Sequence, residues 1–351
     1  MLNYLILLSL LLLLCCFGES CHEQPEGCIG ALQTSLLQQK MCGMSLTAPR
    51  NQFVDDPMID MKDLGIDWVA LLPYGSFDQD NAEITFDSTG NMGSWWGESP
   101  TGITTSHQLA QAQGIKTMLK PQLWSWQRWI GDMNYTTQAE WDKFHGEYTT
   151  FICFWARLAE QLQVDLFCIG TEIKNSAMYH PQYWEQLIDS VRQIYSGSIT
   201  YAPNWDEYQD IVFWDRLDYI GVDAYFSLLP DSTPAVCDLK DAWEPIKTDL
   251  KAFSELWNKP ILFTEWGYLT LSGCAWQTWI LEQNRSSASI NQQAQANAAQ
   301  ALLETFGTED WWAGGFQWKW YSDINTSTRD RSDDYTPQGK LTEEVLKVLY
   351  K

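Results

Sequence analysis

Positive charge is scarce in this chain, which has 22 Lys and Arg against 45 Asp and Glu. The formal net charge is -23 and the pI is about 4.4. Nucleic acids and anionic membrane surfaces are bound through patches of Lys and Arg. The charge balance therefore excludes both as the main partner. It fits a neutral or cationic ligand, and solubility alone would also explain it.

Histidine is equally scarce, with four copies, and the nine cysteines form no CxxC motif. Because zinc sites need clusters of Cys and His, we expect no metal site. In an exported protein, Cys28 could pair with Cys42 and Cys237 with Cys274. Two further cysteines are predicted to be buried thiols, one in a helix and one in a strand: Cys153 and Cys168.

A glycine-rich phosphate turn is also missing after the first apolar run, MCGMSLTAP (41–49). An open, doubly wound sheet that binds a nucleotide would usually carry one. No linker or low-complexity tract interrupts the later chain, so we predict one domain over residues 41–351.

The N-terminus lacks the Lys or Arg of a typical export signal but has an apolar run from Leu5 to Leu14. This run is too short to span a bilayer securely, and it predicts a signal peptide over 1–21 and a linker over 22–40. Cysteines after the run resemble a lipoprotein cleavage site, and Ser20 supplies the small residue before one of them. The candidate lipidated residues are Cys15, Cys16 and Cys21. We expect export to the periplasm or cell surface, and any membrane contact only through a lipid anchor; anchoring and plain secretion both stay open.

Tryptophan is abundant, with 20 copies. Many of these side chains must form core. The others suit a cleft that binds sugars, because indole faces stack on sugar C–H groups while hydroxyls bond to polar neighbours.

Eight apolar, strand-length runs alternate with amphipathic helix patterns after residue 40. The runs cover 41–49, 68–77, 115–126, 165–172, 198–205, 217–228, 259–268 and 312–323. The clearest helix pattern covers 137–163, and others cover 183–195, 239–257, 289–306 and 342–349. Strands that alternate with helices form parallel βαβ units, and eight units close into a (β/α)8 TIM barrel.

Two glutamates end apolar runs where the active site of such a barrel lies. Glu172 ends IGTE and Glu265 lies in FTEW, 93 residues further on. This places them at the ends of the fourth and seventh strands, across one cleft. Glycoside hydrolysis needs such a pair, one carboxyl protonated and the other ionised. The alternative is that each glutamate only makes a structural salt bridge, with Lys120 or Lys319.

The phrases LKPQLW, GTE, FTEWGY and GFQWKWYSD make residues 40–350 similar to clan A of the glycoside hydrolases, and most of all to family 113, the β-mannanases. The resemblance implies a retaining (β/α)8 enzyme. Carried over by position, Glu172 is the acid/base and Glu265 the nucleophile. Tyr225 matches the tyrosine that supports the nucleophile, and Trp320 the tryptophan under the attacked sugar.

One position departs from the clan. Most members have Asn directly before the acid/base, where it binds the sugar 2-hydroxyl, and here that residue is Thr171. The axial 2-hydroxyl of mannose is compatible with a changed contact, and Asn204 is a candidate replacement. Further candidates for substrate binding at the strand ends are Lys120, Gln122, Trp124, Trp205, Trp266 and Asp323. Lys120 could instead tune Glu172, and each of these tryptophans could instead be core.

We therefore expect a monomeric, retaining hydrolase of β-1,4-mannosidic bonds in mannan or manno-oligosaccharides, with no metal or organic cofactor. Two alternatives remain, a clan-A hydrolase of another β-glycan such as glucan, xylan or galactan, and a non-catalytic glycan-binding barrel.

Overall fold

The computed structural model describes residues 37–90, 95–324 and 328–351. The expected signal peptide (1–21) and all but the last four residues of the linker (22–40) lie outside them. Within the described chain, no helix is both long and apolar enough to cross a membrane.

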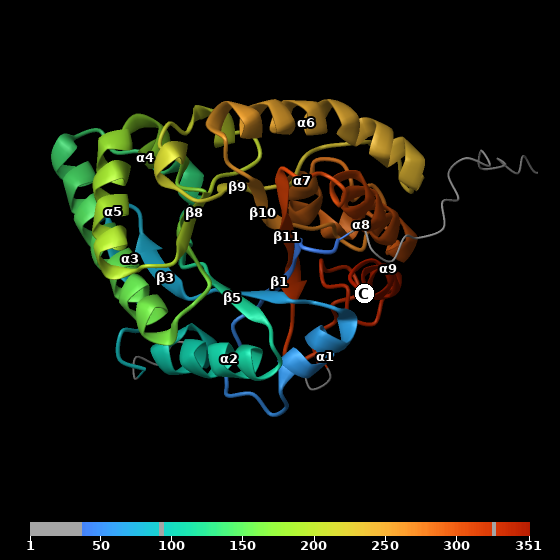
Figure 1. Ribbon diagram of the computed structural model, residues 1–351, viewed down its shortest axis with the longest axis horizontal. Coiled ribbons are helices and arrows are strands. Elements are labelled where there is room, and N and C mark those ends of the chain that lie inside the picture. The colour runs from blue at the N-terminus through green and yellow to red at the C-terminus, as the bar shows by residue number, and fades with distance from the viewer. Residues whose placement is uncertain (1–36, 91–94, 325–327) are drawn as a thin grey trace, which may run out of the picture. The chain divides into compact units, whose positions relative to one another are not determined.

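The main sheet has eight parallel strands in the order β8-β7-β5-β2-β1-β11-β10-β9. A parallel bridge from Asn204 to Asp223 joins the β8 side to the β9 side. The bounds are β1 (Met41–Leu46), β2 (Trp68–Leu71), β5 (Lys116–Leu119), β7 (Leu166–Thr171), β8 (Ser198–Ala202), β9 (Ile220–Asp223), β10 (Ile261–Trp266) and β11 (Trp312–Trp320). Figure 1 shows helices around this ring of strands. The predicted (β/α)8 barrel is confirmed.

The helices that the periodicity predicts are present, with small shifts at their ends. They are α3 (Gln138–Leu162), α5 (Pro181–Ile194), α6 (Val236–Trp257), α8 (Gln292–Phe306) and α9 (Leu341–Leu349). Thr137 and Glu140 form a capping box that fixes the start of α3. The pattern does not predict four further helices, α1 (Pro57–Leu64), α2 (Pro100–Ala112), α4 (Lys174–Tyr179) and α7 (Thr278–Gln283).

Two of the predicted strand runs are each split by a proline. Pro73 separates β2 from β3 (Tyr74–Asp78), and Pro121 separates β5 from β6 (Gln122–Trp124). Proline has no backbone N–H to donate to a ladder, so the barrel strand ends there. The detached parts form a small sheet with β4 (Glu83–Thr85), in the order β4-β3-β6. The small sheet therefore lies in the chain directly after β2 and β5, which are neighbours in the barrel.

The barrel interior is packed with side chains from alternating strand positions. The inner cluster comprises Trp68, Ala70, Leu72, Met118, Leu166, Cys168, Ala202, Leu262 and Phe316. The intervening residues, such as Val69 and Phe167, face the helices in a second and larger cluster. This alternation decides which residues at the strand ends face the cleft.

Of the two candidate disulfides, Cys237–Cys274 is not formed, because both residues are free thiols. Cys42 is also a free thiol, and its candidate partner Cys28 lies outside the described residues. Cys153 and Cys168 are buried thiols in α3 and β7, as predicted.

Candidate active site

Glu172 directly follows β7 and lies in a turn that lifts its side chain off the strand. Its φ of 52° falls in the left-handed region, which costs a non-glycine residue about 1–2 kcal/mol. Its backbone N–H donates to the carbonyl of Ala202, at 2.8 Å, which fixes this turn against β8. The indole N–H of Trp129 donates to Glu172 Oε2 at 2.9 Å.

Glu172 is suited to hold a proton near neutral pH. Burial disfavours its charge, the nearby Glu265 adds repulsion, and together they raise the pKa of Glu172 to about 7. The hydrogen bond from Trp129 and the charge of Lys120 oppose this rise.

Glu265 faces the cavity because the register of β10 shifts just before it. Phe263 pairs with Val222 but Glu265 pairs with Asp223, so one extra residue, Thr264, is accommodated on β10. The shift places Glu265 on the inner side. Trp266 then points outward, where it is fully buried among the core residues.

Four polar groups converge on the Glu265 carboxylate or on its ion-pair partner. Tyr225 donates to Oε2 at 2.9 Å, and Gln122 donates to Oε1 at 2.9 Å. The ammonium of Lys120 lies 2.5 Å from Oε1 and 3.3 Å from Asp223 Oδ1. Every donor to Glu265 favours its ionised form, since each would lose a strong acceptor on protonation.

Lys120 has no access to a ligand, because its side chain is fully buried. Burial disfavours the ammonium, but the carboxylates of Asp223 and Glu265 outweigh this effect and raise the pKa of Lys120. The structure therefore places Lys120 behind Glu265 and not against a sugar. Gln122 is also mostly buried, and its amide is directed to Glu265.

The two glutamates line one cavity of about 760 Å³. Its wall comprises Trp129, Asp132, Glu172, Asn204, Trp205, Asp206, Tyr225, Glu265, Thr278, Trp279, Glu282, Gln283, Trp318, Lys319 and Tyr335. Trp205 stacks on Trp279, with ring centroids 5.6 Å apart. This combination of indole faces and polar groups is typical of a site that holds a polyhydroxylated ligand.

Some of the residues expected in the site lie elsewhere. Trp320 is buried and lines a different hollow together with Asp323, which forms an ion pair with Arg331. Trp124 is 55% exposed at the end of β6 and is not in the cavity wall. The tryptophan of β11 that does reach the cavity is Trp318.

The register of β11 explains this difference of two residues. Ser45 pairs with Trp318 and the next residue, Leu46, pairs with Trp320. The irregularity breaks the alternation of sides, so that Trp318 faces the cavity and Trp320 does not. Of the other predicted residues, Asn204, Trp205 and Tyr225 line the cavity. Thr171 does not, and its hydroxyl is buried without a hydrogen-bond partner.

Sequence reasoning missed several residues of the wall. Trp129 and Tyr335 come from loops after the strands, and Trp279 and Glu282 from the short helix α7, where no clear periodic pattern marks a position. The tryptophan-rich segment LWSWQRW could have indicated Trp129 as a candidate for sugar binding, and its three tryptophans are all at least 40% exposed.

A further buried carboxylate, Glu207, interacts electrostatically with Glu172. Glu207 is fully buried, and neither of its oxygens has a hydrogen-bond partner. Burial and the charge of Glu172 raise the pKa of Glu207 to about 8, and the ammonium of Lys174, 3.6 Å away, opposes this. Within the described residues, no group of three or more His, Cys, Asp and Glu side chains is placed to hold a metal ion.

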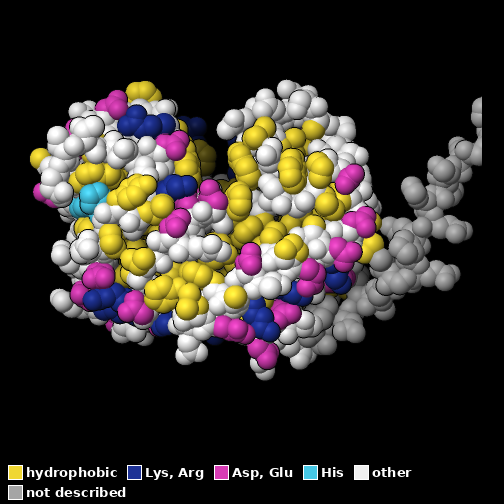
Figure 2. Space-filling model, turned by 90° about the horizontal axis from the view of Figure 1, so that it is seen from above, with side chains coloured by type: hydrophobic (Ala, Val, Ile, Leu, Met, Phe, Trp, Pro, Cys, Tyr) yellow, Lys and Arg dark blue, Asp and Glu magenta, His cyan; other side chains and the backbone are white. Residues whose placement is uncertain are grey.

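On the face that Figure 2 shows, the Lys and Arg side chains do not form a continuous patch. Lys and Arg side chains lie there among Asp, Glu and hydrophobic side chains, and the face is deeply hollowed between two raised parts.

A (β/α)8 barrel with two carboxylates in one aromatic-walled cavity at its strand ends has the design of a glycoside hydrolase. The profile of Glycoside Hydrolase Family 113 matches residues 48–340. The chain belongs to this family and is a glycoside hydrolase, whose substrate is an oligo- or polysaccharide. No curated protein matches it.

Solved structures share the fold. A family 113 β-1,4-mannanase solved as a complex has a TM-score of 0.75 and 22% identity over 89% of this chain and 99% of that chain. The family 113 β-mannanase from Alicyclobacillus acidocaldarius, in complex with ManMIm, has a TM-score of 0.74 and 22% identity, covering 89% and 97%. A β-glucuronidase from Ruminococcus gnavus has a TM-score of 0.61 and 12% identity, covering 89% and 50%.

Proposed function

We propose that this chain is a retaining hydrolase of β-1,4-mannosidic bonds, with Glu265 as nucleophile and Glu172 as acid/base. The observation that carries the proposal is the opposite electrostatic surroundings of two carboxyls in one cavity. Glu265 accepts from Lys120, Gln122 and Tyr225, which favours its ionised form. Glu172 has a pKa raised to about 7, which favours its proton.

In the first step, a Glu265 oxygen bonds to the anomeric carbon as the glycosidic C–O bond breaks. Glu172 gives its proton to the departing oxygen, and the leaving sugar diffuses away. The glycosyl group is then held as an ester of Glu265, whose negative charge is gone.

In the second step, Glu172 is ionised and takes a proton from water. The water oxygen bonds to the anomeric carbon from the side that the leaving group vacated, and the bond to Glu265 breaks. Two displacements return the original anomeric configuration. The loss of the Glu265 charge during the intermediate makes the pKa of Glu172 fall, because the repulsion that raised it disappears.

Mannan is the proposed substrate because the solved family 113 structures that are similar in fold are named β-mannanases. Trp129, Trp205, Trp279 and Trp318 supply indole faces for several sugar rings. A β-glucan, xylan or galactan would need the same two carboxyls, so the assay must separate these substrates.

The test is incubation of wild type and Glu265→Ala with mannan, galactomannan, glucan and xylan oligosaccharides, with NMR of the anomeric proton in the first product. We expect mannan cleavage with retention, and loss of cleavage in Glu265→Ala. Preference for another glycan would overturn the proposal that mannan is the substrate. Inversion would overturn the mechanism, and full activity of Glu265→Ala would overturn the role of Glu265.

The acid/base role of Glu172 has its own test. Glu172→Ala should still cleave aryl glycosides with good leaving groups, because these need no proton, and azide should rescue it by replacing water as the second nucleophile. An equal loss on all substrates, without rescue, would contradict the role.

We also propose export of the chain, with a leader over residues 1–21 and a choice between secretion and lipid anchoring. Fractionation of cells and labelling with a lipid precursor would test it. Label that is lost in Cys21→Ala supports the anchor, and retention of the full chain in the cytoplasm contradicts export.

A further inference from the structure

Lys319 is a cation in the cavity wall that the proposed mechanism does not use. It lies in β11 next to Trp318, and both side chains line the cavity that contains the two glutamates. Its ammonium lies 5.2 Å from the centroid of the Trp318 ring and 5.5 Å from that of Tyr321. Lys319 is only partly exposed.

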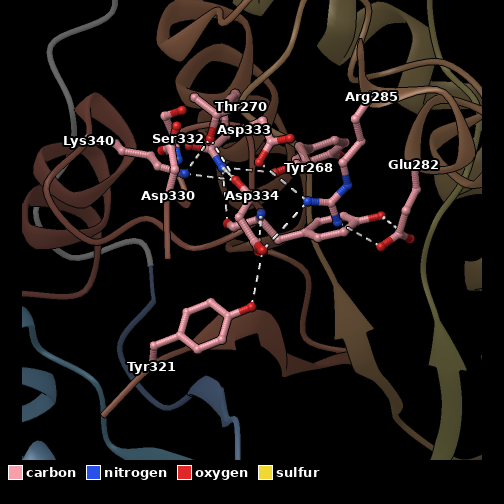
Figure 3. Close-up of polar contacts among 12 residues, drawn as sticks. Tyr268, Thr270, Glu282, Arg285, Tyr321, Asp330, Ser332, Asp333, Asp334 and Lys340 are labelled. Carbon is pink, nitrogen blue, oxygen red and sulfur yellow. Dashed lines mark hydrogen bonds and ion pairs between the residues drawn. The ribbon is translucent and has the colours of Figure 1, made fainter. Parts of the chain in front are cut away.

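No side chain or carbonyl of the described part of the chain forms a hydrogen bond or an ion pair with the Lys319 ammonium. Its carboxylate neighbours are engaged elsewhere, as Figure 3 shows. Glu282 accepts from Arg285 at 2.9 Å and from Tyr335 at 3.0 Å. Asp334 accepts from Tyr321 at 3.1 Å and lies 3.6 Å from Arg285.

An unpaired ammonium in a mostly buried place is costly, and a ligand oxygen would remove that cost. Burial lowers the pKa of Lys319, and the charges of Asp334 and Glu282 oppose this without contacting the ammonium. Lys319 therefore differs from Lys120, whose charge is fully satisfied by Asp223 and Glu265.

The position of β11 in the barrel shows which part of a substrate Lys319 would meet. In the strand order, four steps separate β11 from β7 in either direction around the ring, so the two strands lie opposite each other. Glu172 follows β7 and is proposed to protonate the leaving oxygen. The leaving sugar thus lies on the β7 side, and the sugar that Glu265 attacks lies on the β11 side.

We infer that Lys319 is a specificity-determining residue that donates a hydrogen bond to a hydroxyl of the sugar attacked by Glu265. Glu282, which Arg285 and Tyr335 hold in the same wall, is placed to accept from a hydroxyl of the same sugar. This inference rests on the proposed function, since it uses the assigned roles of Glu172 and Glu265.

The structure favours a neutral hydroxyl over a carboxylate as the partner of Lys319. A uronic acid would bring a second negative charge next to Glu282 and near Asp334, and like charges at such distances repel. A hydroxyl can accept a hydrogen bond from the Lys319 ammonium and at the same time donate one to the Glu282 carboxylate.

The experiment compares wild type, Lys319→Met and Lys319→Arg on an aryl β-mannobioside and on analogues that lack one hydroxyl of the sugar next to the aryl group. On the parent substrate we expect Lys319→Met to lower kcat/KM on the order of 10- to 100-fold, as for a lost charge-assisted hydrogen bond. On one deoxy analogue this difference should disappear, because the partner is already missing. Lys319→Arg should retain part of the activity on the parent substrate.

The matched control is Lys347→Met, an exposed lysine in the last turn of α9, and thermal unfolding shows whether each variant is folded. The same loss on every analogue would overturn the inference, because it would mean a structural role. A further outcome is that wild type cleaves an aryl glucuronide or mannuronide faster than the parent substrate and that Lys319→Met loses this preference. That result would overturn the proposal that Lys319 binds a hydroxyl and would indicate a carboxylate as its partner.

Failure of the proposed function is distinguishable. If the wild type cleaves no β-glycoside, the reaction is wrong, and calorimetric binding of mannotetraose to wild type and Lys319→Met still tests the contact. Equal affinities, or no binding to either protein, would then overturn the inference.

Discussion

The ammonium of Lys120 lies 2.5 Å from Glu265 Oε1, and the lysine side chain is fully buried. The same ammonium holds Asp223, so one cation balances two carboxylates beneath the cavity. A buried carboxylate without such a partner would be protonated or would destabilise the fold.

Replacement of this cation should affect both stability and activity. In Lys120→Met, two buried carboxylates lose their partner, and breaking a buried pair costs about 3–5 kcal/mol. We expect a lower Tm and a lower kcat/KM, since Glu265 loses the ammonium that holds its carboxylate in place. Lys143→Met is the control, because its ion pair with Glu83 is exposed and is worth less than about 1 kcal/mol. A Lys120→Met protein with unchanged Tm and kcat/KM would contradict this account.

The hydrogen bond from Trp129 to Glu172 should set the alkaline limb of activity. Glu172 must be protonated in the first step, so its pKa of about 7 predicts loss of activity above that pH. The bond favours the ionised carboxylate. Its removal in Trp129→Phe should therefore raise the pKa and move the alkaline limb to higher pH, on the order of half a unit to one unit for a partly exposed donor. Trp126→Phe, at a position 71% exposed, should leave the limb in place. A shift to lower pH in Trp129→Phe would refute the prediction.

Tyr225 should contribute to catalysis more than to stability. Burial and the charge of Glu265 raise the pKa of Tyr225 well above its usual value, so its hydroxyl stays a donor over the working pH range. Tyr225→Phe removes one donor to Glu265 and should lower kcat about 10- to 100-fold, a loss typical of a bond to a charged group. Steady-state kinetics and thermal unfolding measure both effects, with the exposed Tyr179→Phe as control. Unchanged kcat would mean that Lys120 and Gln122 suffice to orient Glu265.

Glu207 should make stability depend on pH. Its pKa of about 8 in the folded chain lies above the usual value of 4.5. The unfolded chain therefore releases this proton first, and the stability that protonated Glu207 contributes is complete below about pH 4.5 and is lost as pH rises to about 8. Glu207→Gln keeps a neutral side chain at all pH values, so it should raise Tm more at pH 8 than at pH 5. Glu344→Gln, on an exposed position of α9, is the control. An equal change at both pH values would exclude the titration of Glu207 as the cause.

Much of the barrel is predictable from the sequence because strands and helices each leave a periodic pattern. The runs before Glu172 and Glu265 alternate between inner and outer positions, and parallel strands bring their ends to one edge. The resemblance of the surrounding phrases to the family adds the roles that we propose for the two glutamates. The runs over 68–77 and 115–126 are predicted as unbroken strands although they contain Pro73 and Pro121, and the small sheet that follows these prolines depends on the long-range pairing of β3 with β6.

The residues that could not be placed depend on register, which no local pattern encodes. Because of the irregularity in β11, Trp318 lines the cavity and Trp320 does not. Because of the irregularity in β10, Trp266 is buried in the core. The sequence places Lys120 among the polar residues at the strand ends that could bind substrate. Its burial could not be predicted, because its partners Asp223 and Glu265 lie more than 100 residues away in sequence. Wall residues such as Trp129 lie in loops without periodicity, and Trp279 lies in a helix of six residues that is too short to leave a clear pattern.

The extra residue in β10 has a consequence for how this gene can change. The extra residue is Thr264, because Phe263 pairs with Val222 and Glu265 with Asp223. A single-codon deletion at Thr264 would therefore make β10 regular while leaving Glu265 opposite Asp223, but it would remove the hydroxyl that donates to Asp223 Oδ1 at 2.8 Å. Loss of activity in a folded deletion variant, but not in Thr264→Ser, would show that the carboxylate needs the irregular backbone as well as its neighbour on β9.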